Sequence, residues 1–274
     1  MRKGFIICTV ALFLYACEGT TVQQHTPEKT PSDTANVIIN DSTALSNTTF
    51  ELIPLTNSPE FADAILELNA PDNESIINSN EVSFNYNIKN YQLGKPTTDG
   101  SCAVNSANSD KGQHIHLILN NQPYLAKCES SFIENLEDGH YVALSFLSRS
   151  YHESIKEFGA SDLRQFTVGK AKSQKVDLTE PMLFYSRPKG EYKGKDTENV
   201  LLDFFLVNTN LSEKGIKVRA TINGKPFLID DWRGYIMKGL PLGETTIKLE
   251  LVDSSLKLIP GLYNSIERKI FLKR

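Results

Sequence analysis

The sequence lacks an apolar run long enough to span a membrane. Its N-terminal run extends only from Gly4 to Tyr15, after the basic pair Arg2 and Lys3, whereas a transmembrane helix needs about 20 apolar residues. A short basic head before such a run is typical of a secretory signal peptide. We therefore expect residues 1–16 to be a signal peptide and the folded part to lie outside the cytoplasm.

The sequence also has no excess of basic residues. The chain holds 29 Lys and Arg against 33 Asp and Glu, a net charge of −4. Removal of residues 1–16 takes away Arg2 and Lys3 and no acidic residue, so 27 basic residues would remain against 33 acidic ones, a net charge of −6. Nucleic-acid binding depends on neutralising phosphates, so no nucleic-acid partner is expected.

Familiar catalytic motifs are absent from the sequence. The chain has no G-x-S-x-G nucleophile elbow, no H-E-x-x-H motif and no phosphate-binding glycine loop. We therefore expect a non-catalytic protein that needs no cofactor.

Cysteine is scarce, with four residues, and one of them has a distinctive context. The segment LYAC, residues 14–17, resembles the bacterial lipobox, whose cysteine is lipidated and becomes the new N-terminus. Each buried CH₂ contributes about 0.8 kcal/mol, so several acyl chains give a stable anchor. Cys17 is thus the predicted lipidation site, which ties the protein to a membrane of the cell envelope, with the outer membrane favoured. A plain secreted protein is the alternative.

Two cysteines belong to the folded part. Cys8 would leave with the signal peptide, so Cys102 and Cys128 remain in a compartment that permits disulfides. We predict that they form a disulfide bond. Two separate thiols are the alternative.

Residues 17–48 and the rest of the chain differ in texture. Residues 18–48 are rich in Thr, Ser, Asn and Pro without an apolar period, which predicts a flexible tether. From about residue 50, short runs alternate apolar and polar residues, as β-strands with one buried face do. These runs are AILELNA (64–70), EVSFNYNI (81–88), HIHLILN (114–120), YVALSFLS (141–148) and RQFTV (164–168).

The strand pattern repeats. Landmarks in two segments match at one constant offset: Val82, Phe84, Tyr86, Ile88, Asn90 and Leu93 match Val200, Leu202, Phe204, Leu206, Asn208 and Leu211. Pro71 has its counterpart in Pro188, and LNNQPY (119–124) echoes INGKPF (222–227). The fold class predicted is all-β, with two tandem immunoglobulin-like antiparallel sandwiches at 49–172 and 173–274.

The first copy carries an insertion. Twenty residues separate Leu93 from His114, where the second copy has only SEKGI. Loops of this size without structure of their own are often functional, and the predicted disulfide would join this loop to the next hairpin. The loop 95–112 is therefore a candidate binding surface.

The chain resembles a group of uncharacterised two-module envelope lipoproteins of Gram-negative bacteria, some of which are labelled phosphopeptide-binding protein. The resemblance covers about residues 50–274 and is carried by GQHIHLILNNQPY, LSFLSRSYHESIK, FYSRPKGEYKGKD, VRATINGKPF and GLPLGETTIKLEL. It implies a lipid-anchored protein of sandwich domains and supplies no mechanism.

Histidine is the residue type that most suggests a site. In HIHLILN, Ile115, Leu117 and Leu119 are expected to face the core, which leaves His114, His116 and Ile118 on the opposite face. Neutral imidazoles suit Zn or Cu, so the candidate metal ligands are His114, His116, His140 and His152. Because His140 and His152 are twelve residues apart, at most one of them should join the pair. Histidines that only bind neighbouring strands or solvent are the alternative.

A basic segment offers a second candidate. Arg187, Lys189 and Lys193 lie around a glycine-containing turn and are candidate anion ligands. A solvated hairpin loop is the competing interpretation.

The function expected from the sequence is a lipid-anchored binding or scaffolding module for a protein or an envelope polymer. The loop 95–112 and the His114/His116 face are the expected contact surfaces. The alternatives are a periplasmic metal-handling protein and a phosphopeptide- or anion-binding protein.

Overall fold

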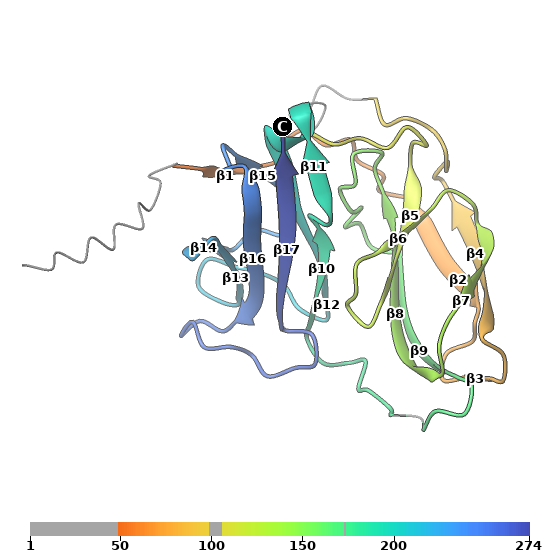
Figure 1. Ribbon diagram of the computed structural model, residues 1–274. Coiled ribbons are helices and arrows are strands. Elements are labelled where there is room, and N and C mark those ends of the chain that lie inside the picture. The colour runs from red at the N-terminus through yellow and green to blue at the C-terminus, as the bar shows by residue number, and fades with distance from the viewer. Residues whose placement is uncertain (1–48, 99–105, 173) are drawn as a thin grey trace, which may run out of the picture. The chain divides into compact units, whose positions relative to one another are not determined.

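A computed structural model describes residues 49–98, 106–172 and 174–274, which belong to one compact unit spanning residues 46–274. The predicted signal peptide, Cys17 and the whole predicted tether lie outside the described residues. The described part consists of strands and one short 3₁₀ helix, Gly194–Thr197 (Figure 1). Among these residues, none of the helices has the length and apolarity required to cross a bilayer.

The first sandwich has a three-stranded and a five-stranded sheet. The order β2-β4-β7 comprises Ile65–Ala70, Glu81–Lys89 and Ser131–Asn135. The order β3-β9-β8-β5-β6 comprises Ile76–Ile77, Ser161–Val168, Gly139–Ser148, His114–Leu119 and Leu125–Lys127. In β4, buried and exposed residues alternate, because successive side chains of a strand point to opposite faces. Its buried Val82, Phe84 and Tyr86 belong to the core of this sandwich.

The second sandwich follows the same plan. Its four-stranded sheet, β1-β15-β12-β10, comprises Glu51–Pro54, Tyr235–Lys238, Asn199–Val207 and Met182–Arg187. Its five-stranded sheet, β11-β17-β16-β13-β14, comprises Glu191–Lys193, Ser265–Lys273, Gly243–Val252, Lys217–Ile222 and Lys225–Ile229. A separate core, with Phe204, Ile222 and Leu249 among its members, lies between these sheets.

The predicted repeat is present in the geometry. Strand β12 (199–207) lies 118 residues after β4 (81–89) at both ends, since 199 − 81 and 207 − 89 both equal 118. The peptide bonds before Pro71 and Pro188 are both cis, and Asn90 and Asn208 share a φ of 55°. In each copy the last strand pairs antiparallel with the strand before it and parallel with a short early strand. This arrangement confirms the prediction of an all-β chain with immunoglobulin-like sandwiches.

Strand β1 departs from the predicted module boundary. Residues 49–172 were assigned to the first sandwich, but β1 pairs antiparallel with β15 of the second (Figure 1). Phe50 lies in the core of the second sandwich and contacts the ring of Phe227, with centroids 5.6 Å apart. The apolar Phe50 anchors the segment there, and strand pairing extends that sheet.

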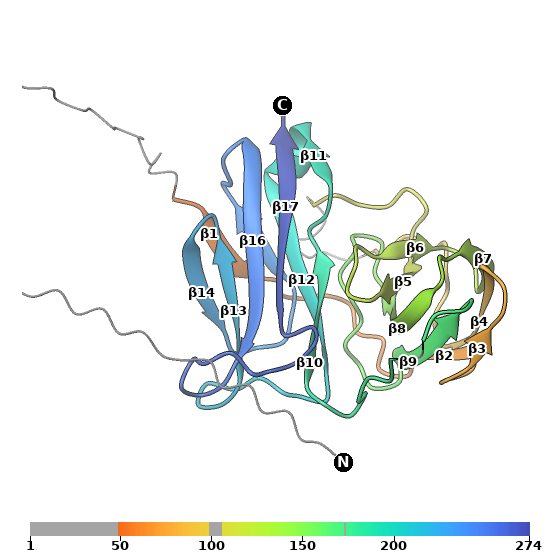
Figure 2. The ribbon, with the colours of Figure 1, turned by 60° about the horizontal axis from the view of Figure 1, so that its bottom comes forward.

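An apolar layer joins the two sandwiches. Strands β10 and β12 of the second sandwich face β5 and β8 of the first (Figure 2). The layer contains Ile118, Phe146, Phe184 and Phe205, and the rings of Phe146 and Phe205 stack with centroids 4.8 Å apart. The two repeats are therefore packed against each other rather than linked only by their connecting chain.

Candidate functional site

Three histidines lie together beside this junction. His114 and His116 project from β5, and His152 lies in the loop that joins β8 to β9. Their neighbours Ile115 and Leu117 face the core of the first sandwich, as the alternation predicted. The opposite face is not solvated: His114 and His116 are both 0% exposed. Tyr124, His152 and Ser186 of β10 lie against this face, so it is not the contact surface that was expected from the sequence.

The nitrogen atoms of the three rings converge. His114 Nε2 lies 2.9 Å from His116 Nε2 and 3.0 Å from His152 Nδ1. One ring nitrogen from each residue can be chosen so that all lie within 4.8 Å of one another. The hydroxyl of Tyr124 lies 3.3 Å from His152 Nδ1, and its ring stacks on His116 at a centroid distance of 3.6 Å. We call His114, His116 and His152 the histidine trio.

Backbone contacts fix the tautomer of one member. His114 Nδ1 lies 2.7 Å from the carbonyl oxygen of Gly112. A carbonyl accepts only, so this nitrogen carries the proton, and the Nε2 of the neutral ring has a free lone pair directed at the trio. His116 Nδ1 lies 3.4 Å from the hydroxyl of Ser186 on β10, so the second sandwich also contacts the cluster.

The trio is electrically neutral at physiological pH. Burial lowers the pKa of His114 to about 4, and the nearby charges of Arg187 and Lys189 act in the same direction. Burial, followed by the neighbouring histidines, holds the pKa of His116 well below its usual value. Burial and Arg187 also lower the pKa of His152 strongly. All three imidazoles are therefore available as neutral ligands.

His140 does not join the trio. Its ring nitrogens lie 3.0 Å from Thr167 Oγ1 and 3.0 Å from Gln165 Oε1, on the neighbouring strand β9. The four-histidine ligand set is thus reduced to three. The argument from the spacing of His140 and His152 is consistent with this arrangement, since β8 places the former at its start and the latter lies beyond its end.

The three candidate anion ligands likewise do not all lie together. Arg187 is 8% exposed and donates from Nη1 to the hydroxyl of Tyr192 at 2.8 Å. Lys189 donates to the carbonyl oxygen of Tyr124 at 2.7 Å and lies over its ring, 3.7 Å from the centroid. Lys193 is exposed and lies 3.8 Å from Glu191, so the structure does not place it with the other two.

Two cations near the trio, the buried Arg187 and the partly buried Lys189, form no direct ion pair with a carboxylate in the described part of the chain. Burial, and then Arg187, lowers the pKa of Lys189 to about 8, so this side chain is still mainly charged at pH 7. The cations Arg187 and Lys189 therefore act on the imidazoles, while the carboxylate of Asp203 on β12 acts on Arg187.

Tyr124 was not identified from the sequence, although a signal was present. The repeat aligns Tyr124 with Phe227 of the second copy, so the first copy has gained a hydroxyl at a buried position. Likewise His152, with a φ of 72°, occupies the place of Leu256, with a φ of 61°. The sequence therefore did contain an indication of the site, because these polar residues occur in the first copy of the repeat and not in the second.

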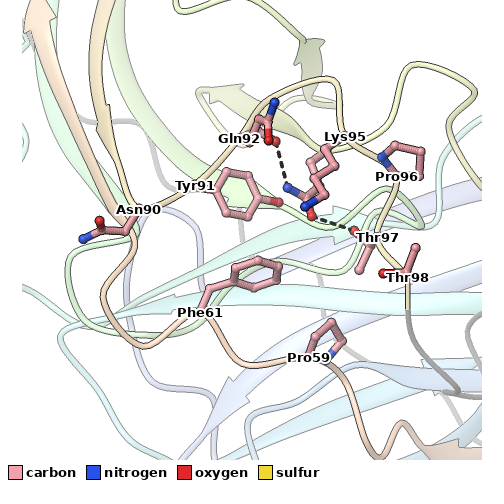
Figure 3. A pocket seen from close by; sticks show the side chains of 10 residues that line it. Pro59, Phe61, Asn90, Tyr91, Gln92, Lys95, Pro96, Thr97 and Thr98 are labelled. Carbon is pink, nitrogen blue, oxygen red and sulfur yellow. Dashed lines mark hydrogen bonds between the residues drawn. The ribbon is translucent and has the colours of Figure 1, made fainter.

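A groove lies at the base of the long loop. It has a volume of about 540 Å³ and combines aromatic, proline and amide side chains (Figure 3). It is lined by Pro59, Phe61, Asn90, Tyr91, Gln92, Lys95, Pro96, Thr97, Thr98 and Gln113. The rings of Phe61 and Tyr91 meet edge to face, with centroids 4.9 Å apart. The start of the predicted binding loop thus forms one wall, whereas residues 99–105, including Cys102, lie outside the described residues.

Hydrogen bonds hold this wall in place. Gln113 Nε2 donates to the carbonyl oxygen of Gln92 at 2.8 Å, and Thr97 Oγ1 donates to Gln113 Oε1 at 3.1 Å. Gly112 has a φ of +74°, and a Cβ there would lie 2.6 Å from the carbonyl oxygen of Gly94. The chain segments around Gly94 and Gly112 are therefore close together at the base of the loop, and only glycine fits at position 112.

Cys128 lies near the same loop. It forms no disulfide with a described residue, and its Sγ lies 3.8 Å from the carbonyl oxygen of Lys111. The thiol is partly exposed. The bond to Cys102 stays a prediction because that partner is not among the described residues.

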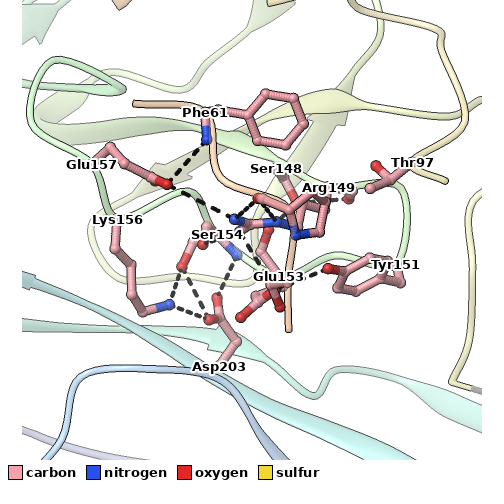
Figure 4. A network of polar contacts seen from close by, with 12 residues as sticks. Phe61, Thr97, Ser148, Arg149, Tyr151, Glu153, Ser154, Lys156, Glu157 and Asp203 are labelled. Carbon is pink, nitrogen blue, oxygen red and sulfur yellow. Dashed lines mark hydrogen bonds and ion pairs between the residues drawn. The ribbon is translucent and has the colours of Figure 1, made fainter. Parts of the chain in front are cut away.

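A polar network connects the groove to the second sandwich (Figure 4). Asp203 of β12 is 0% exposed and accepts hydrogen bonds from Ser154 Oγ at 3.0 Å and from Lys156 Nζ at 2.7 Å. In the same loop, Arg149 Nε donates to the carbonyl oxygen of Pro59, and Arg149 Nη1 lies 3.4 Å from Glu153. The loop that carries His152 is thus attached to both sandwiches.

Comparison with known proteins identifies no family. No family model matches the chain, and no curated protein matches it. Among solved structures, the fibronectin(III)-like modules of Clostridium thermocellum CbhA are 11% identical, with 76% of this chain and 94% of that chain covered and a TM-score of 0.27.

Two other solved structures are comparably distant. SGBP-B of the Bacteroides ovatus mixed-linkage glucan utilization locus is 8% identical, covering 76% of this chain and 70% of that one at a TM-score of 0.24. The Ig1-2 module of the Drosophila receptor protein tyrosine phosphatase DLAR is 10% identical, covering 77% and 99% at 0.22. Such scores carry no functional argument, and the fold assignment depends on the strand topology described above.

Proposed function

We propose that the protein is a lipid-anchored, non-catalytic binding module of the cell envelope. The observation that carries this proposal is the groove at the base of the loop 95–112, a loop that is replaced by the short segment SEKGI in the second copy. A groove that combines aromatic rings, prolines and amides suits an extended, uncharged segment of a protein or an envelope polymer. The His114/His116 face no longer belongs to the proposed contact surface, since it is buried.

The introduction of two carboxylates into the groove is expected to abolish partner capture. Gln92 and Lys95 are exposed, and neither side chain forms a hydrogen bond with another described residue. Gln92→Glu with Lys95→Glu should therefore leave the melting temperature unchanged. The introduced carboxylates would require desolvation when a neutral segment binds. Affinity capture from envelope extracts should lose its partner with the double variant.

A matched control is provided by the second copy. Lys214 is exposed in the short loop at the corresponding place, and Lys214→Glu should retain the captured partner. Equal capture by the groove variant and the wild type would exclude the groove as the binding surface.

Membrane attachment is proposed to depend on Cys17. Cys17→Ser removes the only thiol at the lipobox, so the variant is expected to appear in the soluble envelope fraction, while the wild type should remain with membranes after a high-salt wash. Cys128→Ser, which leaves the lipobox intact, serves as the control. Membrane retention of the Cys17→Ser protein would contradict lipid anchoring.

A further inference from the structure

The histidine trio has the donor geometry of a metal site. A metal–nitrogen bond of about 2.0–2.1 Å in a tetrahedral site separates the ligand nitrogens by roughly 3.3 Å. The nitrogen–nitrogen separations of 2.9 and 3.0 Å around His114 Nε2 are within a few tenths of an ångström of that value. The three ligand atoms all lie within 4.8 Å of one another, so the rings of His116 and His152 would adjust their positions to surround one ion together with His114.

The surroundings of the trio meet two further requirements. The Gly112 carbonyl oxygen orients His114 and leaves its Nε2 unprotonated, and such contacts to the second nitrogen are typical of metal-binding histidines. His152 is only partly buried, so the loop that carries it provides a route for an ion to enter. The fourth position could be filled by a solvent molecule or by the Tyr124 hydroxyl, which already lies 3.3 Å from His152.

The charge around the trio restricts the kind of ion. The three ligand atoms all come from imidazole rings, and no carboxylate belongs to this cluster in the described part of the chain. Arg187 and Lys189, which form no direct ion pair with a described residue, both act on the imidazoles. Their repulsion is twice as large for a dication as for a monocation at the same place, and hard cations such as Ca²⁺ and Mg²⁺ prefer oxygen ligands.

We propose that His114, His116 and His152 form a binding site for a single copper ion and that this site favours Cu⁺ over Zn²⁺. Imidazole is a good ligand for both metals, and the repulsion from Arg187 and Lys189 favours the lower charge. A bound ion joins the loop of His152 to β5. Because Ser154 and Lys156 of that loop bind Asp203 of the second sandwich, the ion also reinforces the junction. This site is independent of the groove and of lipid anchoring.

The test is an anaerobic competition titration of the purified protein with Cu⁺, using a chromophoric Cu⁺ chelator. Free thiols are first alkylated, because Cys128 is partly exposed and thiolates bind Cu⁺. The expected result is one Cu⁺ per chain. Failure of the correctly folded wild type to retain Cu⁺ would overturn the proposal.

His152→Asn is the diagnostic substitution. Asn tolerates the positive φ of 72° at this position but offers no imidazole. Loss of one of three ligands should weaken Cu⁺ binding at least about 100-fold, since changes to outer-shell partners alone cost 10–100-fold. His140→Asn removes an imidazole outside the trio and should bind Cu⁺ as the wild type does. Unchanged binding by a folded His152→Asn protein would contradict the assignment.

A second variant tests the role of charge separately from the fold. Lys189→Met removes one cation near the trio, and the same titration is carried out with Zn²⁺. If affinity for Cu⁺ rises roughly threefold, affinity for Zn²⁺ should rise about tenfold, because the electrostatic free energy scales with ion charge. Equal changes for the two ions, or tighter wild-type binding of Zn²⁺ than of Cu⁺, would overturn the proposed preference.

Discussion

Asp203→Ala is expected to lower the free energy of unfolding by about 3–5 kcal/mol, the usual cost of removing one partner of a buried ion pair. Asp203 is fully buried at the junction, and Lys156 lies 2.7 Å from it with a side chain that is 15% exposed. The substitution leaves the Lys156 ammonium group without its carboxylate and removes the acceptor of Ser154. Urea denaturation at pH 7.5 measures the change.

An exposed ion pair provides the matched control. Lys175 Nζ lies 2.8 Å from Glu74, at the same kind of distance, but the side chains are 69% and 47% exposed. Lys175→Ala should therefore change the free energy of unfolding by less than about 1 kcal/mol. If Asp203→Ala cost no more than this control, the network at the junction would contribute little to stability.

Acidification from pH 7.5 to pH 4.5 is expected to destabilise the metal-free protein by at least about 3 kcal/mol. His114 has a folded-state pKa of about 4, against about 6.5 in an unfolded chain. Between these values the unfolded chain binds a proton that the native protein excludes. The stabilisation is therefore complete above pH 6.5 and is lost as the pH falls toward 4, with His116 and His152 acting in the same direction.

His152→Asn distinguishes the trio from other acid-sensitive groups. The variant removes one of the three excluded protons, so its free energy of unfolding should fall less steeply between pH 6.5 and pH 4.5. Urea denaturation at several pH values in the presence of a metal chelator gives the slope. A slope identical to that of the wild type would show that the trio does not control acid sensitivity.

Local patterns predicted the strands well because the alternation of side chains is a property of neighbouring residues. Strand β5 places Ile115 and Leu117 in the core, as expected from HIHLILN. The same pattern does not reveal what covers the other face. Ser186, which contacts His116, is 70 residues away in sequence. The alternation of residues within β5 and within β10 therefore did not predict that these two strands pack together.

The candidate sites were predicted only in part, for the same reason. The spacing of His114 and His116 indicated a shared face, whereas the arrival of His152 depends on how the loop after β8 folds back. Arg187 and Lys189 approach the trio because the end of β10, where the register of pairing with β12 shifts, and the residues after it pack on Tyr124. Lys193, only four residues beyond Lys189, lies on β11 beside the last strand instead. Proximity along a basic segment therefore did not predict a common site.

The position of β1 makes the second sandwich discontinuous in sequence. Its first strand lies before the first sandwich and its remaining strands lie after it, so the first sandwich is an insertion within the second. A pulling force applied to the chain at residue 49 would act first on the hydrogen bonds between β1 and β15 of the second sandwich. It would reach the first sandwich, which follows β1 in sequence, only after these bonds break. A cut between residues 172 and 173 would leave Phe50 and its strand on the wrong fragment, so the two halves cannot be expressed as separate, complete folding units with that boundary.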